Sequence, residues 1–161
     1  MTPRVVVDAE AMHTLGREVA AVLRAGDLVL LSGALGAGKT TFAQGVGDGL
    51  GVRGPVTSPT FVIARVHPSL VDGPPMVHVD AYRLGGWDEL EDLDLEETLD
   101  DAVTLVEWGT GVAEGLSGDR LEVRIERAVG SRLGPSAEQS LDDLDARQVT
   151  FTGIGRRWAE T

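Results

Sequence analysis

The sequence of 161 residues contains no cysteine, and this absence excludes several kinds of site at once. Without thiols the chain can form no disulfide, thiolate zinc site, iron–sulfur cluster or cysteine nucleophile. The three histidines, His13, His67 and His78, are too scattered along the sequence to suggest a metal cluster. Any bound metal is therefore expected on oxygen ligands.

Long apolar runs are also lacking. No run approaches the roughly 18 residues that a membrane span needs, and the first residues show no signal-peptide core. We therefore expect a cytoplasmic protein with no membrane association. The length and the 42% hydrophobic content suit one folded domain over residues 1–161.

Basic residues are scarce, since 14 Lys and Arg stand against 26 Asp and Glu, for a net charge of −12. A chain this acidic is not expected to bind nucleic acid directly with high affinity, because such binding neutralises phosphates with a basic surface. Nine of the fourteen residues from Asp88 to Asp101 are carboxylates, which is typical of a solvated helix face and also suits a surface for a protein partner. Lys39 is the only lysine in the sequence.

The apolar pattern alternates between strands and helices and predicts an α/β fold, with a mixed, mostly parallel sheet flanked by helices. Unbroken apolar runs indicate buried strands, whereas alternation indicates a strand with one wet face. The expected strands are 4–8, 28–31, 60–66, 76–79, 103–106, 121–125 and 149–152. The expected helices are 9–25, with Met12, Leu15, Val19, Val22 and Leu23 on its buried face, 39–50, and 87–101 in two pieces. Residues 130–146 lose all periodicity and are expected to form a surface loop.

A phosphate-binding motif, G-x-x-x-x-G-K-[ST], lies between the second strand and the second helix. In such a loop the backbone N–H groups and the positive end of the helix dipole surround an anion. Lys39 is expected to reach the β- and γ-phosphates, and the Thr40 hydroxyl to bind Mg²⁺. The expected nucleotide-binding residues are Gly33, Ala34, Leu35, Gly36, Ala37, Gly38, Lys39, Thr40 and Thr41. The alternative is a glycine-rich turn without a ligand.

Two carboxylates follow buried strands and can complete such a site: Asp80 after residues 76–79 and Glu107 after residues 103–106. Each could ligate the metal, hold a metal-bound water or orient the attacking water, or could simply face solvent. Ser58 and Thr60 precede a strand, so their hydroxyls could form a switch-like loop near the γ-phosphate or belong to an ordinary proline-directed turn.

These segments together closely resemble the bacterial TsaE (YjeE) family over residues 8 to 127. The similarity rests on Leu35-Gly36-Ala37-Gly38-Lys39-Thr40-Thr41-Phe42, Ser58-Pro59-Thr60-Phe61, His78-Val79-Asp80-Ala81-Tyr82-Arg83-Leu84 and Val106-Glu107-Trp108, in this order. The resemblance implies a small ATPase, with ATP and Mg²⁺ as cofactors, that serves the threonylcarbamoyladenosine (t6A) modification of A37 in tRNA. It also implies binding to a complex of the TsaD and TsaB proteins, with ATP hydrolysis supporting repeated turnover.

Carried over from the family, Lys39 and Thr40 would bind phosphate and Mg²⁺, and Glu107 would be the Mg²⁺-associated acid. Asp80 would be a second essential carboxylate, so that Lys39, Asp80 and Glu107 form the catalytic set. Ser58 and Thr60 would belong to the switch-like loop, and Trp108 would lie beside the site. Residues 128–161 match no part of the family pattern that can be assigned a role.

Two other functions share the phosphate-binding motif. A small-molecule kinase could use Asp80 as the base for a substrate hydroxyl, although the arginine-rich lid usual in such kinases is not evident after Arg127. A nucleotide-responsive binding module would bind ATP without hydrolysing it. Phosphate release, measured with and without TsaD and TsaB, separates these alternatives from an ATPase.

Overall fold

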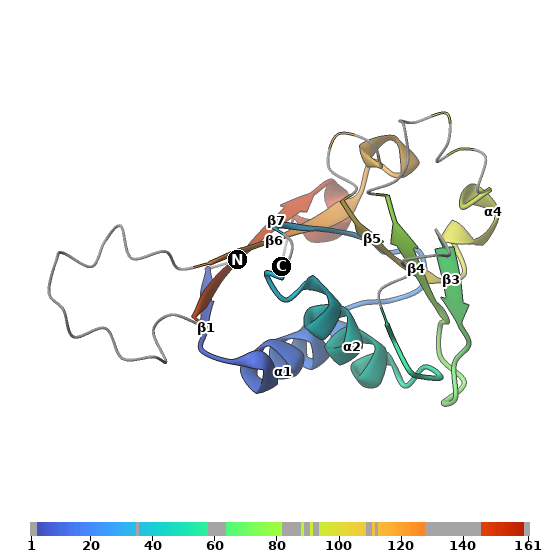
Figure 1. Ribbon diagram of the computed structural model, residues 1–161. Helices are drawn as coiled ribbons and strands as arrows, with labels where there is room; N and C mark the ends of the chain where they lie inside the picture. Colours follow the sequence, from blue (N-terminus) through green and yellow to red (C-terminus); the bar gives the residue numbers. More distant parts are fainter. Residues whose placement is uncertain are drawn as a thin grey trace, which may run out of the picture.

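The computed structural model describes residues 3–34, 36–57, 64–81, 88, 91, 94–108, 111, 113–127 and 146–159. A seven-stranded mixed sheet forms the centre of the fold, in the order β1-β7-β6-β2-β5-β4-β3 (Figure 1). The strands are β1 (Arg4–Val6), β2 (Leu28–Gly33), β3 (Ala64–His67), β4 (Met76–Asp80), β5 (Val103–Glu107), β6 (Arg120–Arg127) and β7 (Arg147–Ile154). The helices are α1 (Ala9–Ala20), α2 (Lys39–Leu50) and α4 (Glu96–Leu99), with 3₁₀ turns η1 (Glu114–Leu116) and η3 (Arg156–Trp158).

The centre of the sheet is parallel and its two edges are antiparallel, which confirms the expected mixed α/β fold. β2 pairs in parallel with both β5 and β6, and β5 pairs in parallel with β4. β1, β7 and β3 join as antiparallel strands. The four central parallel strands, β6, β2, β5 and β4, therefore end at the same edge of the sheet, where a ligand site is expected in α/β folds.

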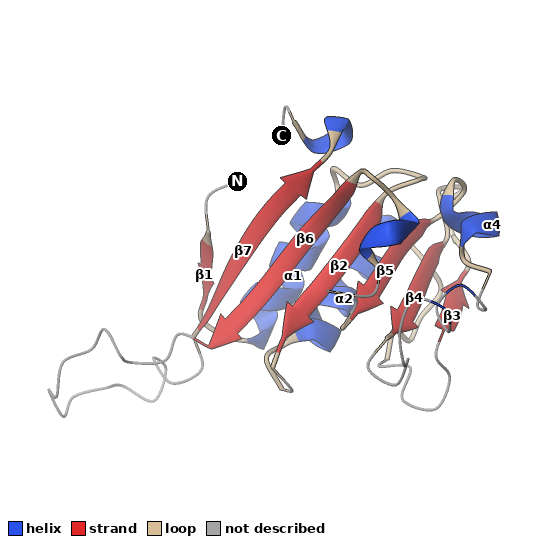
Figure 2. Ribbon diagram, turned by 90° about the horizontal axis from the view of Figure 1, so that it is seen from above, coloured by secondary structure: helices blue, strands red, loops and turns tan. Residues whose placement is uncertain are grey.

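Helices α1 and α2 lie together on one face of the sheet, and α4 and η1 lie on the other (Figure 2). Beneath α1 and α2 the larger core packs Phe42 and Val46 against Leu31 and Val123 of the sheet. A smaller core under α4 and η1 contains Leu30 and Val106. β2 and β5 are thus buried on both faces, as their unbroken apolar runs predict. No helix among the described residues is long and apolar enough to cross a membrane.

Helix α1 is shorter than the sequence predicts. The Asp8 carboxylate caps its first turn by accepting from the Ala11 N–H, but the helix ends at Ala20 instead of Ala25. Beyond Ala20 the N–H groups of residues 21–23 bond three residues back, so the chain continues as tight turns toward β2. The expected burial of Val22 is wrong: it is 46% exposed, and its carbonyl oxygen accepts a hydrogen bond from Arg157.

The polar ends of β6 and β7 also extend beyond the predicted strands. They pair antiparallel over eight residues each, from the Arg120–Ile154 pair to the Arg127–Arg147 pair. Their buried side chains are apolar, namely Leu121, Val123, Ile125, Val149 and Phe151, whereas the opposite face carries charged groups on β6 and the hydroxyls of Thr150 and Thr152 on β7. The short apolar stretches therefore underestimate the lengths of the two strands, because alternate side chains of each strand face away from the larger core.

The acidic segment 88–101 is described only in part. Asp88 and Glu91 are helical, and α4 follows at Glu96–Leu99. Of the expected strand 60–66, residues 60–63 lie outside the described residues, and β3 runs to His67 instead of Val66. The expected surface loop 130–146 also lies outside them, apart from Ala146.

Glycines in α1 and α2 let the two helices approach closely. A Cβ on Gly45 would lie 2.1 Å from the His13 carbonyl oxygen, and one on Gly16 would lie 2.4 Å from the Phe42 carbonyl oxygen. Gly45 weakens the intrinsic helix propensity of α2, yet α2 spans the predicted residues 39–50. The glycines therefore serve the contact between the helices.

Replacement of Gly45 by alanine is expected to lower the free energy of unfolding by about 2 kcal/mol, because the added methyl would force the backbones of α1 and α2 apart. The gain in helix propensity, about 1 kcal/mol, offsets only part of the overpacking cost. Urea denaturation measures the loss. Gly118→Ala is the matched control, since nothing lies within 4 Å of its added Cβ. Equal stability of the two variants would contradict the close helix contact.

His67, at the end of β3, is a buried neutral histidine. The residue is 4% exposed, its Nδ1 donates to the Arg53 carbonyl oxygen at 3.0 Å, and Nε2 is buried with no partner among the described residues. Burial lowers the pKa of His67, with smaller contributions from His78 and Arg65, and outweighs the opposing hydrogen bond. Protonation would place an unpartnered N–H in the core.

The free energy of unfolding is therefore expected to fall as the pH drops below about 6.5, the ordinary histidine pKa. In that range the unfolded chain binds a proton at residue 67 and the folded chain does not, so acid favours unfolding. The contribution is at most about 1.4 kcal/mol per pH unit and ends once the lowered folded-state pKa is reached. His67→Asn keeps a donor for Arg53 and should flatten the slope in urea denaturation between pH 7.5 and 5.5. Parallel slopes for both proteins would exclude His67 as the cause.

Candidate functional site

The loop from the end of β2 to the start of α2 forms the centre of the candidate site. β2 ends at Gly33 and α2 begins at Lys39, so the phosphate-binding motif connects strand and helix as the sequence predicts. Gly38, which precedes the helix, has φ 108°, a conformation that favours glycine. A Cβ on Gly33 would lie 2.5 Å from the Ile125 carbonyl oxygen, so only glycine fits there without a shift of the backbone. Leu35 lies outside the described residues.

The Lys39 ammonium lies within this loop. Its Nζ donates to the carbonyl oxygens of Gly33 at 2.7 Å and Ala34 at 3.1 Å, and lies 4.1 Å from the centroid of the Trp108 ring. Burial lowers the pKa of Lys39, while the carboxylates of Glu107 and Asp80 oppose the shift. The loop therefore holds a partly desolvated cation whose attraction for an anion is less screened by water than at the surface.

Asp80 and Glu107 lie side by side beside this cation. β4 and β5 pair so that the two residues are direct partners in register, each at the last position of its strand. Glu107 is only 3% exposed, so the alternative that it faces solvent is wrong. Its Oε2 lies 2.7 Å from Nε2 of His78, which is fully buried. The fold thus places two carboxylates and one ammonium at the same edge of the sheet.

Of the remaining predicted site residues, some lie at this edge of the sheet and others lie outside the described residues. Thr40 and Thr41 lie in the first turn of α2, both partly buried. Ala34, Gly36 and Ala37 belong to the loop between β2 and α2. The switch-like residues Ser58 and Thr60 lie outside the described residues.

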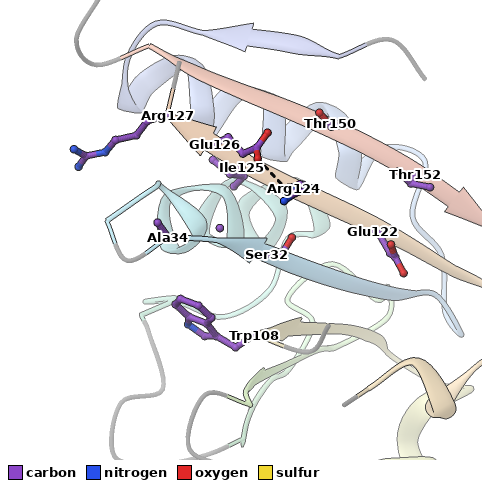
Figure 3. A pocket seen from close by; sticks show the side chains of 11 residues that line it. Ser32, Ala34, Trp108, Glu122, Arg124, Ile125, Glu126, Arg127, Thr150 and Thr152 are labelled. Carbon is purple, nitrogen blue, oxygen red and sulfur yellow. Dashed lines mark ion pairs between the residues drawn. The ribbon is translucent and has the colours of Figure 1, made fainter. Parts of the chain in front are cut away.

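Trp108 follows Glu107 with φ 61°, an uncommon conformation for a bulky residue. Its N–H bonds the Leu31 carbonyl oxygen at 3.1 Å, which holds the turn against β2. The indole lies at one end of a groove of about 860 Å³ on the face of the sheet opposite α1 and α2 (Figure 3). Outward side chains of β6 and β7, including Arg124, Thr150 and Thr152, line the rest of the groove.

A smaller hollow of about 270 Å³ adjoins the loop on the side of α1. Asp8, Ala9, Met12, Gly36, Ala37, Gly38, Thr41 and Arg147 line it. Nε of Arg147 donates to the Ala37 carbonyl oxygen at 3.2 Å, so β7 contacts the loop directly. The sequence gives no sign of this contact, because the two residues are 110 positions apart.

His78 is the functional candidate that sequence reasoning missed. The three histidines are indeed dispersed along the chain, but a carboxylate two residues after His78 places both on one face of β4. The period of two could have indicated that His78 faces the same site as Asp80. Its partner Glu107 could be found only from the pairing of β4 with β5.

The strand order, the glycine-rich loop and the lysine at the start of α2 define an α/β protein with the fold of P-loop nucleoside triphosphatases. Residues 6–133 match the family model described as the threonylcarbamoyl adenosine biosynthesis protein TsaE. The chain belongs to the TsaE family, whose members are named for tRNA threonylcarbamoyladenosine biosynthesis.

Individual relatives agree with this assignment over most of the chain. A TsaE protein of Streptomyces coelicolor is 64% identical over 149 residues, covering 92% of this chain and 94% of the relative. A TsaE protein of Bacillus subtilis is 38% identical over 153 residues, covering 94% and 85%. The crystal structure of Bacillus subtilis YdiB superposes with a TM-score of 0.73 at 32% identity, covering 99% of this chain and 89% of that structure.

Proposed function

We propose that this protein is a Mg²⁺-dependent ATPase that binds a TsaD–TsaB complex in the cytoplasm and supports its modification of tRNA through ATP hydrolysis. The observation that carries the proposal is the placement of Lys39 in the loop before α2, with Asp80 and Glu107 at the adjoining strand ends. A phosphate-binding cation beside two carboxylates is the arrangement that nucleoside triphosphate hydrolysis requires.

The loop suits the phosphates and the neighbouring hollow suits the nucleoside. Lys39 would transfer its hydrogen bonds from the Gly33 and Ala34 carbonyl oxygens to phosphate oxygens, which form stronger charge-assisted bonds. The N-terminus of α2 would add its dipole. The 270 Å³ hollow adjoins the same loop, so a base bound there would be continuous with phosphates over α2.

The donor set suits Mg²⁺. Thr40 and Glu107 offer the oxygen atoms that this ion prefers, and no group of three or more metal-ligating side chains occurs among the described residues. Such a sparse set is typical of Mg²⁺ held largely by substrate phosphates and water. When bound, the ion would neutralise the charge that develops on the phosphates. Asp80, beside Glu107, is placed to orient or deprotonate the attacking water.

The net charge of −12 supports a protein partner more than direct contact with tRNA. Phosphate release by the purified protein, with and without TsaD and TsaB, tests the proposal. Release that is stimulated by the complex and needs Mg²⁺ is the expected result. Phosphoryl transfer to a metabolite would indicate a kinase, and tight binding without release would indicate a nucleotide-responsive module.

A further inference from the structure

His78, which has no part in the proposed function, forms a buried pair with Glu107. Nε2 of His78 lies 2.7 Å from Oε2 of Glu107, and the two side chains are 0% and 4% exposed. A polar contact so fully removed from water is costly unless its geometry is well satisfied. The pair therefore fixes the position of both side chains.

The pairing of β4 with β5 explains how the two side chains meet. His78 is opposite Leu105 and Asp80 is opposite Glu107, so Glu107 is the diagonal neighbour of His78. Side chains two residues apart share a face of a strand, which places His78, Asp80 and Glu107 on the face covered by α2. Diagonal neighbours of this kind lie within reach of long side chains.

The hydrogen-bond partners indicate which nitrogen of His78 carries the proton. The Glu107 carboxylate can only accept, so Nε2 donates. Nδ1 is buried and has no partner among the described residues, so a hydrogen there would lack an acceptor. The arrangement thus indicates a hydrogen on Nε2. This N–H donor orients the carboxylate.

We propose that His78 is a positioning residue for Glu107. This inference rests on the proposed function, in which Glu107 acts at the Mg²⁺ and phosphate site. The bond from His78 occupies Oε2 and fixes the plane of the carboxylate, so that Oε1 remains to accept from a metal-bound water or to ligate the metal. Donors in this role commonly raise metal affinity or activity 10- to 100-fold.

Two substitutions of His78 distinguish the effect of losing the hydrogen-bond donor from the effect of losing the volume of the ring. His78→Gln places an amide N–H at a reach similar to that of Nε2, whereas His78→Leu fills the space without a donor. The first readout is the dissociation constant of Mn²⁺ for the protein–ADP complex, which is measured from the electron paramagnetic resonance signal of free Mn²⁺. The second is kcat and KM for ATP in the presence of TsaD and TsaB.

For His78→Leu we expect Mn²⁺ to bind about tenfold more weakly and kcat to fall about 10- to 100-fold, with KM for ATP changed less than about threefold. His78→Gln should recover most of both losses. Thermal unfolding checks that the variants fold; if the leucine variant does not, His78→Asn, whose amide is too short to reach Glu107, takes its place. A purely structural role would not distinguish Gln from Asn in Mn²⁺ affinity.

The outcomes distinguish this inference from the proposed function. A wild-type protein that binds Mn²⁺–ADP and releases phosphate, beside a folded His78→Leu variant with both values within twofold of wild type, overturns the positioning role alone. A glutamine variant as impaired as the leucine variant also overturns it. A wild-type protein that neither binds Mn²⁺–ADP nor releases phosphate contradicts the proposed function, and the positioning role with it.

Discussion

Replacement of Lys39 by alanine is expected to lower partner-stimulated phosphate release at least about 100-fold, the effect typical of removing one donor that stabilises charge in a transition state. The affinity for ATP should fall about 10- to 100-fold as well, since a charge-assisted hydrogen bond contributes about 1.5–3 kcal/mol. The physical reason is the position of Nζ, which already lies within the loop between β2 and α2. Titration calorimetry with ATP and a phosphate-release assay measure the two effects.

The domain should remain folded without this ammonium. Burial already destabilises the charged form of Lys39, as its lowered pKa indicates, so its removal relieves a desolvation cost while it leaves two carbonyl oxygens without their donor. Arg4→Ala is the matched loss of a positive charge, in an exposed ion pair with Glu18. It should leave ATP binding unchanged. Unaltered ATP affinity in Lys39→Ala would show that the loop does not bind the polyphosphate.

The parts of the fold that the sequence predicts well are those in which local pattern and tertiary environment agree. β2 lies between β5 and β6, so its unbroken apolar run reflects burial on both faces. Helix α2 runs from Lys39 to Leu50 as predicted, since the motif fixes its start and Gly51, with φ 71°, ends it. The end of α1 is different: just beyond it the Val22 carbonyl oxygen accepts a hydrogen bond from Arg157, 135 positions along the chain, a contact that no local pattern encodes.

In the candidate site too, local features can be predicted from the sequence, whereas contacts between distant segments cannot. A loop motif is local, so the roles of Lys39 and Thr40 can be predicted from spacing alone. The contact of Arg147 with Ala37 and that of His78 with Glu107 depend on strand order, which no local pattern encodes. Sequence reasoning could select Asp80 and Glu107 as strand-end carboxylates, but only the register shows that they are direct partners.

Glu107, the register partner of Asp80, is the second side chain whose replacement is expected to lower turnover strongly. Glu107→Gln is expected to lower kcat at least about 100-fold, because the amide keeps the shape of the side chain but cannot offer an anionic oxygen to Mg²⁺. ADP affinity measured without Mg²⁺ should change less than about threefold, since the loop and Lys39 are untouched. Mn²⁺ binding to the ADP complex should weaken in parallel with kcat.

Asp80→Asn is the comparison that assigns the two carboxylates their roles. Asp80 is more exposed than Glu107 and is the direct register partner of Glu107, so it suits contact with water more than a buried metal position. Its substitution should reduce kcat while Mn²⁺ affinity stays within about threefold of wild type, as expected for a residue that orients water. If Glu107→Gln turns over normally and Asp80→Asn loses Mn²⁺, the metal-associated role belongs to Asp80, and the buried pair of His78 and Glu107 serves the core alone.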